Sequence, residues 1–196
     1  MANIVLFHHA QGLTDGLKRM AAALERAGHT VFAPDLYEGK TFPTVDDGVA
    51  FAESTGFDVI NARADAALAA APHSTAPHPR VYMGFSMGAE SAARHAQADP
   101  QTAGLILMHA AIDPAWMPSP WPAGLPIQVH ACDQDPWMEF DALAALRTET
   151  EKSRPVEVYL YPGETHLFTD DSVPEYNAVY AQLARTRLLR FLEEVS

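Results

Sequence analysis

Residues 80–98 read RVYMGFSMGAESAARHAQA, and this stretch decides the fold. Its first part, 80–85, is a short apolar run that predicts a strand buried on both faces of a parallel sheet, and 87–98 predicts a helix. Between them, residues 84–88 fit G-x-S-x-G, a tight strand-to-helix turn where a side chain at either glycine would collide with neighbouring backbone. We therefore predict Ser86 as a nucleophile at a helix N-terminus, where free N–H groups favour negative charge.

The rest of the chain continues the alternation of strands and helices. We expect strands at 3–7, 30–33, 80–85, 105–109, 127–131 and 156–161, and helices at 15–27 (capped by Thr14 or Asp15), 45–53, 57–71, 87–98, 137–150 and 175–194. The inward faces should hold Leu17, Met20, Ala21 and Leu24 in the first helix, and Val179, Leu183, Leu188 and Leu192 in the last. This order predicts an α/β protein with a mostly parallel, doubly wound sheet and helices on both faces. The segment 72–79 fits a surface loop, so residues 1–196 should form one domain.

Composition and charge narrow the class of partner. The chain has 196 residues, 48% of them hydrophobic, and 13 basic against 25 acidic residues give a net charge of −12. Such a surface argues against binding nucleic acid or anionic lipid. Cys132 is the only cysteine, which forbids an intramolecular disulfide and favours a reducing compartment. The N-terminus lacks the pattern of a signal peptide and no apolar run could span a bilayer, so we expect a cytoplasmic protein.

A serine nucleophile needs a base and an acid that orients the base. We predict His166 as the base, because it lies in YPGETHLF (161–168), after the last strand, and loops at the carboxyl ends of strands face the ligand crevice. An ordinary loop histidine is the alternative. The acid should come between the serine and the histidine in the chain, and Asp135 is the candidate. Asp133 is the fallback and Asp113 a third choice.

An oxyanion needs two backbone N–H donors. We predict those of Met87, which follows the nucleophile, and Ala10, in the loop after the first strand. Residues that could line a substrate pocket at the same rim are His9, Tyr37, Phe85, Trp116 and Trp137. His9 could instead contact Ser86 or bond to backbone. We expect no metal site, since no pair of histidines has H-E-x-x-H spacing, and Cys132 reads as a small buried hydrophobe.

Five segments together resemble the dienelactone hydrolase family of α/β-hydrolases: FHHAQG (7–12), APDLYEG (33–39), GFSMG (84–88), HACDQD (130–135) and YPGETHLF (161–168). The resemblance covers nearly the whole chain. It implies the α/β-hydrolase fold with a minimal lid and the hydrolysis of an ester or lactone, and it favours Asp135 over Asp133. The best-known members have a cysteine at position 86 and a glutamate at position 9. Their substrate carboxylate is held by arginines, and 167–172 contains none.

The sequence therefore predicts a serine esterase that cleaves a small-molecule ester or lactone through an acyl-enzyme on Ser86, without a cofactor. A thioesterase or acyltransferase using the same three residues is one alternative. A non-catalytic ligand-binding protein on a hydrolase scaffold is another, although such a protein has no need of serine, acid and histidine in this order.

Overall fold

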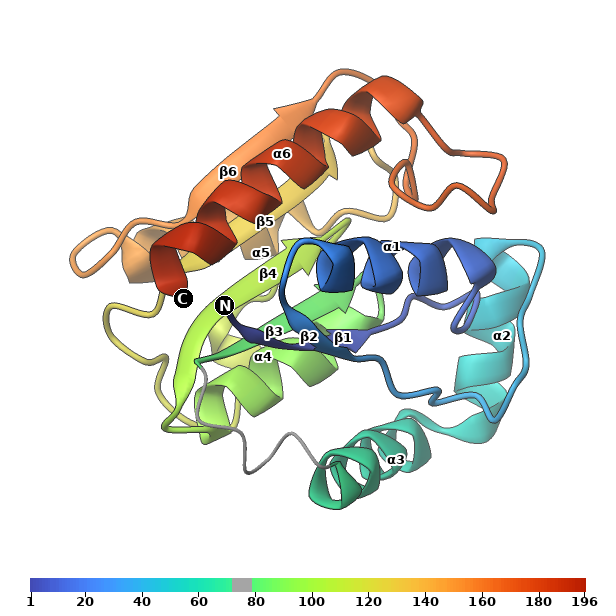
Figure 1. Cartoon of the computed structure of the whole chain (residues 1–196), viewed down its shortest axis with the longest axis horizontal. Coiled ribbons are helices and arrows are strands. Elements are labelled where there is room, and N and C mark those ends of the chain that lie inside the picture. Colours follow the sequence, from blue (N-terminus) through green and yellow to red (C-terminus); the bar gives the residue numbers. More distant parts are fainter. Residues whose placement is uncertain (72–78) are drawn as a thin grey trace.

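The computed structural model describes residues 1–71 and 79–196 and contains a six-stranded, fully parallel sheet in the order β2-β1-β3-β4-β5-β6 (Figure 1). The elements are β1 (Asn3–Phe7), α1 (Asp15–Arg26), β2 (Thr30–Phe32), α2 (Val45–Thr55), α3 (Phe57–Ala70), β3 (Arg80–Phe85), α4 (Gly88–Ala98), β4 (Thr102–Met108), the short 3₁₀ helix η2 (Pro114–Trp116), β5 (Ile127–Cys132), α5 (Phe140–Thr150), β6 (Glu157–Tyr161) and α6 (Ala178–Val195). The predicted fold class, an α/β-hydrolase with a doubly wound sheet, is confirmed.

The strands separate two apolar layers, because successive side chains of a strand point to opposite faces. In β1, Ile4 and Leu6 pack with α1 and α6, whereas Val5 and Phe7 pack with α4. Figure 1 shows α1 and α6 on the near face of the sheet, and the helices that pack on the other layer include α4 and α5. The sheet is therefore covered on both faces, which explains why its central strands are continuously apolar.

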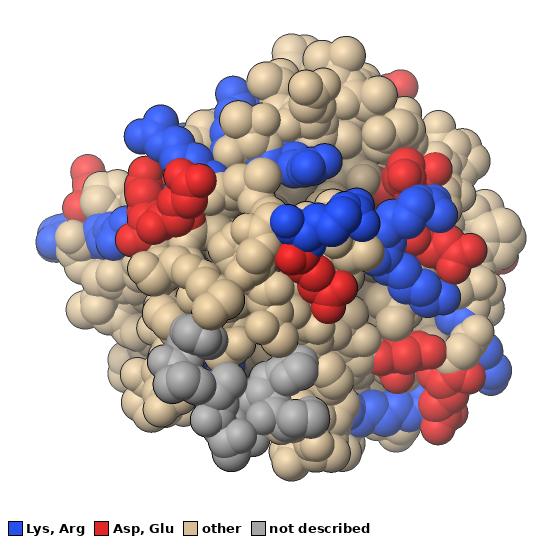
Figure 2. Space-filling model, viewed as in Figure 1, with Lys and Arg blue, Asp and Glu red and all other residues tan. Residues whose placement is uncertain are grey.

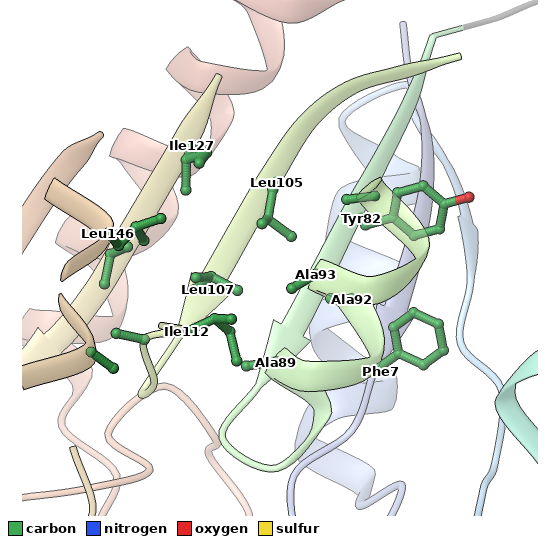
Figure 3. Packing of buried hydrophobic residues seen from close by; sticks show 14 of the residues in the cluster. Phe7, Tyr82, Ala89, Ala92, Ala93, Leu105, Leu107, Ile112, Ile127 and Leu146 are labelled. Atoms are coloured by element: carbon green, nitrogen blue, oxygen red, sulfur yellow. The ribbon is translucent and has the colours of Figure 1, made fainter. Parts of the chain in front are cut away.

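Helix α4 lies close to the sheet because its inner face is made of alanine. Ala89, Ala92 and Ala93 are each no more than 1% exposed and point toward the strands (Figure 3). The larger side chains that fill this layer come from the strands, including Leu105 and Leu107 of β4. Small residues on the helix and branched residues on the sheet give a dense core between α4 and the strands, next to the turn that holds Ser86.

Several predicted boundaries shift. Strand β4 begins at Thr102 and not at 105. Helix α5 begins at Phe140 and not at 137, because residues 135–138 form a turn in which the N–H of Met138 donates a hydrogen bond to Asp135 O. Helix α1 is capped by Thr14, whose Oγ1 accepts from the N–H of Leu17. The predicted loop 72–79 falls almost wholly on 72–78, outside the described residues.

One prediction about α6 is wrong. Val179 and Leu183, expected to face inward, are 65% and 44% exposed, whereas Leu188 and Leu192 are buried as predicted. The inner stripe of the helix runs through Ala184, Leu188, Phe191 and Leu192. Leu183 lies one residue before Ala184, a rotation of about 100°, and Val179 lies five residues before it, which is about 140° away after one full turn.

The surface over α1 and α6 is not uniformly acidic despite the net charge of −12. Figure 2, in the same view as Figure 1, shows lysine and arginine side chains intermixed with aspartate and glutamate on this face. Ion pairs account for part of this mixture, for example Arg19–Asp171 and Arg190–Glu194. No helix within 1–71 or 79–196 is both long and apolar enough to cross a membrane.

Candidate active site

The turn between β3 and α4 holds Ser86 in a left-handed conformation, with φ of 47°. A Cβ atom at Gly84 would lie 2.5 Å from Ala89 Cα, and one at Gly88 would lie 2.5 Å from Phe7 O, distances that real contacts do not allow. Both glycines of the G-x-S-x-G pattern are therefore required by the packing of this turn. The serine side chain is partly exposed at the start of α4.

A chain of hydrogen bonds links three residues from three separate loops. His166 Nε2 lies 2.8 Å from Ser86 Oγ, and His166 Nδ1 lies 2.7 Å from Asp135 Oδ2. Because the serine hydroxyl donates to Nε2, the imidazole proton is on Nδ1 and is donated to the carboxylate. His166 and Asp135 are each 2% exposed, so water does not compete for this bond. The loops after β3, β5 and β6 supply the three residues.

The two other acids considered from the sequence bond elsewhere. Asp133 Oδ1 accepts the N–H of Gly163 at 2.9 Å, which ties the loop after β5 to the loop after β6. Asp113 caps η2 by accepting the N–H of Ala115 at 2.8 Å. Asp135 also accepts the N–H of Trp137 on its second oxygen, at 2.9 Å, so both carboxylate oxygens are fixed.

Met87 directly follows Ser86, and Ala10 lies in the turn after β1. The amides of both residues lack acceptors within the described part of the chain. The path of the first loop is set by His8, whose Nε2 accepts the N–H of Leu36 at 3.1 Å and whose Nδ1–H donates to His9 O at 2.8 Å. Burial lowers the pKa of His8 to about 4, so the ring stays neutral and keeps this tautomer. Gly88 packs directly on the backbone of Phe7 and His8, which brings the loop against the start of α4.

The predicted pocket residues divide into two groups. His9, Tyr37 and Phe85 have 0% exposure, whereas Trp116 and Trp137 are 56% and 43% exposed. The ring centroid of Trp137 lies 6.1 Å from that of His166. Both tryptophans are thus open to solvent, and Trp137 is the one that also lies beside His166, whereas the other three side chains are closed to solvent. The hydroxyl of Tyr37 lies 3.2 Å from Met87 Sδ and so packs beneath the side chain that follows the nucleophile.

Sequence reasoning missed two polar contacts beside these residues. His9 Nε2 bonds to Asp170 Oδ2 at 2.9 Å, and His109 Nε2 bonds to Thr169 Oγ1 at 2.7 Å. Both join the loop after His166 to loops at the ends of inner strands. The available signal was the position of His109, as the last residue of a predicted strand. In the described ranges, 1–71 and 79–196, no group of three or more His, Cys, Asp or Glu residues could hold a metal ion.

A parallel sheet with a serine turn after an inner strand and the acid and histidine in later loops, in the order serine, acid, histidine, defines the class of α/β-hydrolases. Within that class, the chain belongs to the dienelactone hydrolase family, whose sequence model matches residues 1–196. It is thus a member of a family of hydrolases. No curated protein sequence matches it.

Solved structures share the fold at low sequence identity. The structure titled m3DLH is 23% identical, with a TM-score of 0.77 over 99% of this chain and 86% of that one. The dienelactone hydrolase-like promiscuous phosphotriesterase P91 from metagenomic libraries is 20% identical, with a TM-score of 0.74 over 100% and 87% of the two chains. A dienelactone hydrolase from Anabaena variabilis is 20% identical, with a TM-score of 0.61 over 94% and 84%.

Proposed function

We propose that this protein is a serine hydrolase that cleaves an ester or lactone of a small molecule through an acyl-enzyme on Ser86. The observation that carries the proposal is the unbroken series Ser86 Oγ–His166–Asp135, with bonds of 2.8 and 2.7 Å. A serine hydroxyl becomes a useful nucleophile only when a base can take its proton, and a histidine keeps the correct tautomer when an acid holds its other nitrogen.

The reaction follows from this geometry. His166 Nε2 takes the proton of Ser86 as Oγ attacks the substrate carbonyl, and the imidazolium then gives the proton to the leaving alcohol. The N–H groups of Met87 and Ala10 stabilise the tetrahedral oxyanion, and their freedom from other acceptors in the described chain supports this role. A water molecule, deprotonated by His166, attacks the acyl-enzyme and releases Ser86. No cofactor takes part.

Asp135 acts by orientation. Its side chain has 0% exposure, and its two oxygens accept from His166 Nδ1–H and from the Trp137 N–H. A carboxylate held on both oxygens cannot rotate away from the imidazole. It also stabilises the imidazolium that forms during each proton transfer, and this interaction is stronger in a site closed to water.

The acyl or ring part of the substrate contacts Trp137 and Trp116 in this proposal. Both are large apolar side chains with more than two fifths of their surface exposed, and Trp137 lies beside His166. The loop after the base, 167–172, contains no arginine to bind a substrate carboxylate. We therefore expect a preference for uncharged, apolar esters over esters of dicarboxylic acids.

The experiment that tests the function is covalent labelling with a fluorophosphonate probe, followed by peptide mass spectrometry. A stoichiometric adduct on Ser86 that is lost in His166→Ala supports the proposal. Ser91→Ala is the matched control and should leave labelling unchanged. Ser91 is a buried serine of α4, the helix that follows Ser86, and it bonds to Asn61. A folded protein that forms no adduct would overturn the proposal and favour the ligand-binding alternative.

Labelling does not separate an esterase from an acyltransferase or thioesterase, so hydrolysis is then measured with competing acceptors. An esterase releases acid at a rate that added alcohol or thiol barely changes, whereas an acyltransferase transfers the acyl group to the acceptor. Oxygen and thiol esters of the same acid distinguish the thioesterase. An activated phosphotriester is tested as a further substrate, because P91, a structural neighbour, is named as a promiscuous phosphotriesterase.

A further inference from the structure

His109 lies at the centre of the site and has no part in the reaction as proposed. His109 directly follows β4, as Ser86 directly follows the neighbouring strand β3. The two residues lie side by side, since the N–H of Ser86 donates to Met108 O at 2.8 Å. The N–H of His109 donates in turn to His130 O of β5, at 2.6 Å. The backbone of His109 thus lies between the strand that precedes Ser86 and the strand that leads to Asp135.

The backbone of His109 is strained. Its φ is 60°, in the left-handed region that Ser86 also adopts and that glycine enters without cost. A histidine persists in such a conformation only where the surroundings determine it, and strain of this kind concentrates at functional sites. Because the backbone conformation favours glycine, we look to contacts of the imidazole side chain for the reason that a histidine is present here.

The side chain contacts three residues of one loop. Its ring is buried, with a centroid 5.8 Å from that of His166 at an interplanar angle of 61°, and 4.6 Å from that of Phe168 at 89°. Its Nε2 lies 2.7 Å from Thr169 Oγ1. His109 thus contacts the proposed base and two of the three residues that follow it.

This loop needs support because it crosses the sheet. Strand β6 is the edge strand, and β3, which leads to Ser86, is the third strand inward, a distance of about 14 Å at the usual strand spacing. Residues 162–177 contain no helix or strand of their own. The loop is held at the end of β4 by His109 and at the end of β1 by His9, which bonds to Asp170.

We propose that His109 is a positioning residue, whose hydrogen bond to Thr169 and ring contact with His166 hold the proposed base within reach of Ser86. The inference rests on the proposed function of His166. His109 Nδ1 has no partner within the described residues. A bare lone pair is less costly to bury unpaired than an N–H donor, so Nε2 carries the proton and donates it to Thr169 Oγ1.

The ring is suited to this role because it stays uncharged. Burial, followed by the nearby charge of His166, lowers the pKa of His109 well below its ordinary value. The other titratable groups that act on it are His9, His130 and Asp170. A neutral ring supports the imidazolium that forms on His166 during the reaction without repelling it.

The test uses Thr169→Val, Thr169→Ser and His109→Asn, with hydrolysis of p-nitrophenyl butyrate as the readout. Valine keeps the shape of threonine but not its hydroxyl, and serine keeps the hydroxyl. Asparagine tolerates the left-handed backbone but is too short to replace Nε2. We expect Thr169→Val and His109→Asn each to lower kcat about 10- to 100-fold with KM nearly unchanged. The double variant should be no worse than the poorer single variant, and Thr169→Ser should retain activity.

A purely structural role predicts a different pattern. Additive losses in the double variant, an unchanged kcat in folded Thr169→Val, or equal losses in Thr169→Ser and Thr169→Val would each overturn the proposal. His95→Leu is the matched control, since the side chain of His95 is 13% exposed and bonds to Ser91 O and Asp65, away from the site. It should lower the melting temperature without changing kcat.

A second readout does not depend on turnover and so separates this inference from the proposed function. The Nδ1–H proton of His166, bonded to Asp135, gives a far-downfield proton NMR signal when it is shielded from exchange. We expect this signal in the wild type, and its loss or broadening in Thr169→Val and His109→Asn at a temperature where both remain folded. An identical signal in wild type and variants would overturn the positioning role, whether or not the protein hydrolyses esters.

Discussion

His9 Nε2 lies 2.9 Å from Asp170 Oδ2, and this pair joins residues 161 positions apart in a site where each is at most 1% exposed. Asp170 also accepts the hydroxyl of Thr14 at 2.5 Å, and both the N–H and the hydroxyl of Ser172. His9 Nδ1 accepts the N–H of Gln11 at 3.2 Å. The pair thus connects the first loop, which holds the proposed oxyanion donor Ala10, to the loop that holds His166.

Asp170→Asn should destabilise the fold by about 2 to 3 kcal/mol, because an amide N–H₂ would then face donors in a buried site. Chemical denaturation at pH 7 measures this. Asp171→Asn is the matched control. Asp171 pairs with Arg19, and their side chains are 40% and 54% exposed. Loss of such a surface ion pair should cost at most about 1 kcal/mol. Equal effects of the two substitutions would contradict the account.

The same residue gives a prediction for acid stability. Burial by itself would raise the pKa of Asp170, but hydrogen bonds from His9, Ser172 and Thr14 lower it far below its ordinary value. A carboxyl group with a lowered folded-state pKa stabilises the fold above its unfolded pKa, about 3.9. This contribution is lost as the pH falls below that value. The difference in unfolding free energy between wild type and Asp170→Asn should therefore shrink between pH 5 and pH 3.

Buried histidines should make the protein less stable in mild acid. Burial lowers the pKa of His8 to about 4 and of His130 to about 3. Between these values and the ordinary pKa of about 6.5, the unfolded chain binds more protons than the folded one, so stability rises with pH. Acidification from pH 7 to pH 5 should lower the unfolding free energy by about 2 kcal/mol for each such histidine. Denaturation curves that coincide at the two pH values would be inconsistent with neutral buried rings.

Replacement of Asp135 and Asp133 distinguishes the orienting acid from its neighbour. Asp135→Asn should lower kcat by about 10³- to 10⁴-fold with little change in KM, because the amide favours the wrong tautomer of His166. Asp133→Asn should change kcat only a few-fold, since Asp133 bonds to the backbone of Gly163 and not to the imidazole. Steady-state kinetics on one activated ester measures both. The reverse order of effects would move the acid role to Asp133.

Trp137→Ala should change the preference for acyl chain length. Trp137 is 43% exposed and its ring lies 6.1 Å from that of His166, so apolar substrate atoms that pack on it would lose about 1 to 3 kcal/mol of binding. KM should rise for p-nitrophenyl octanoate more than for the acetate. Tyr176→Ala, which removes another exposed aromatic outside the candidate site, is the control. Equal changes for both esters would exclude Trp137 from substrate binding.

Local sequence was sufficient for much of the architecture. Continuous apolar runs and helical periodicity predicted six strands in the correct order along the chain, and β1 and β3 with their observed bounds. The glycines around Ser86 predicted the turn. The steric requirement at Gly84 arises within five residues, at Ala89, whereas the one at Gly88 comes from the backbone of Phe7 on β1. Boundaries shifted where a short turn competed with a helix, as at Asp135–Met138.

Local sequence could not predict which face of a helix packs on the sheet. Val179 and Leu183 fit a helical repeat as well as the true inner stripe does, and only the docking of α6 on the sheet decides which stripe is buried. The three residues proposed for catalysis were named from chain order and strand ends. Their mutual distances of 2.7 and 2.8 Å follow from the parallel sheet, which brings strand ends together at one edge.

What the sequence by itself determined is the set of local features: which segments form strands and helices, where the glycine turn lies, and which side chains are candidates for catalysis. Only the tertiary structure decided the long-range pairs, His9 with Asp170 and His109 with Thr169. The physical reason is that secondary structure depends on neighbours within a few residues. A hydrogen bond between loops depends on strand order and register, which are set by the packing of the whole sheet.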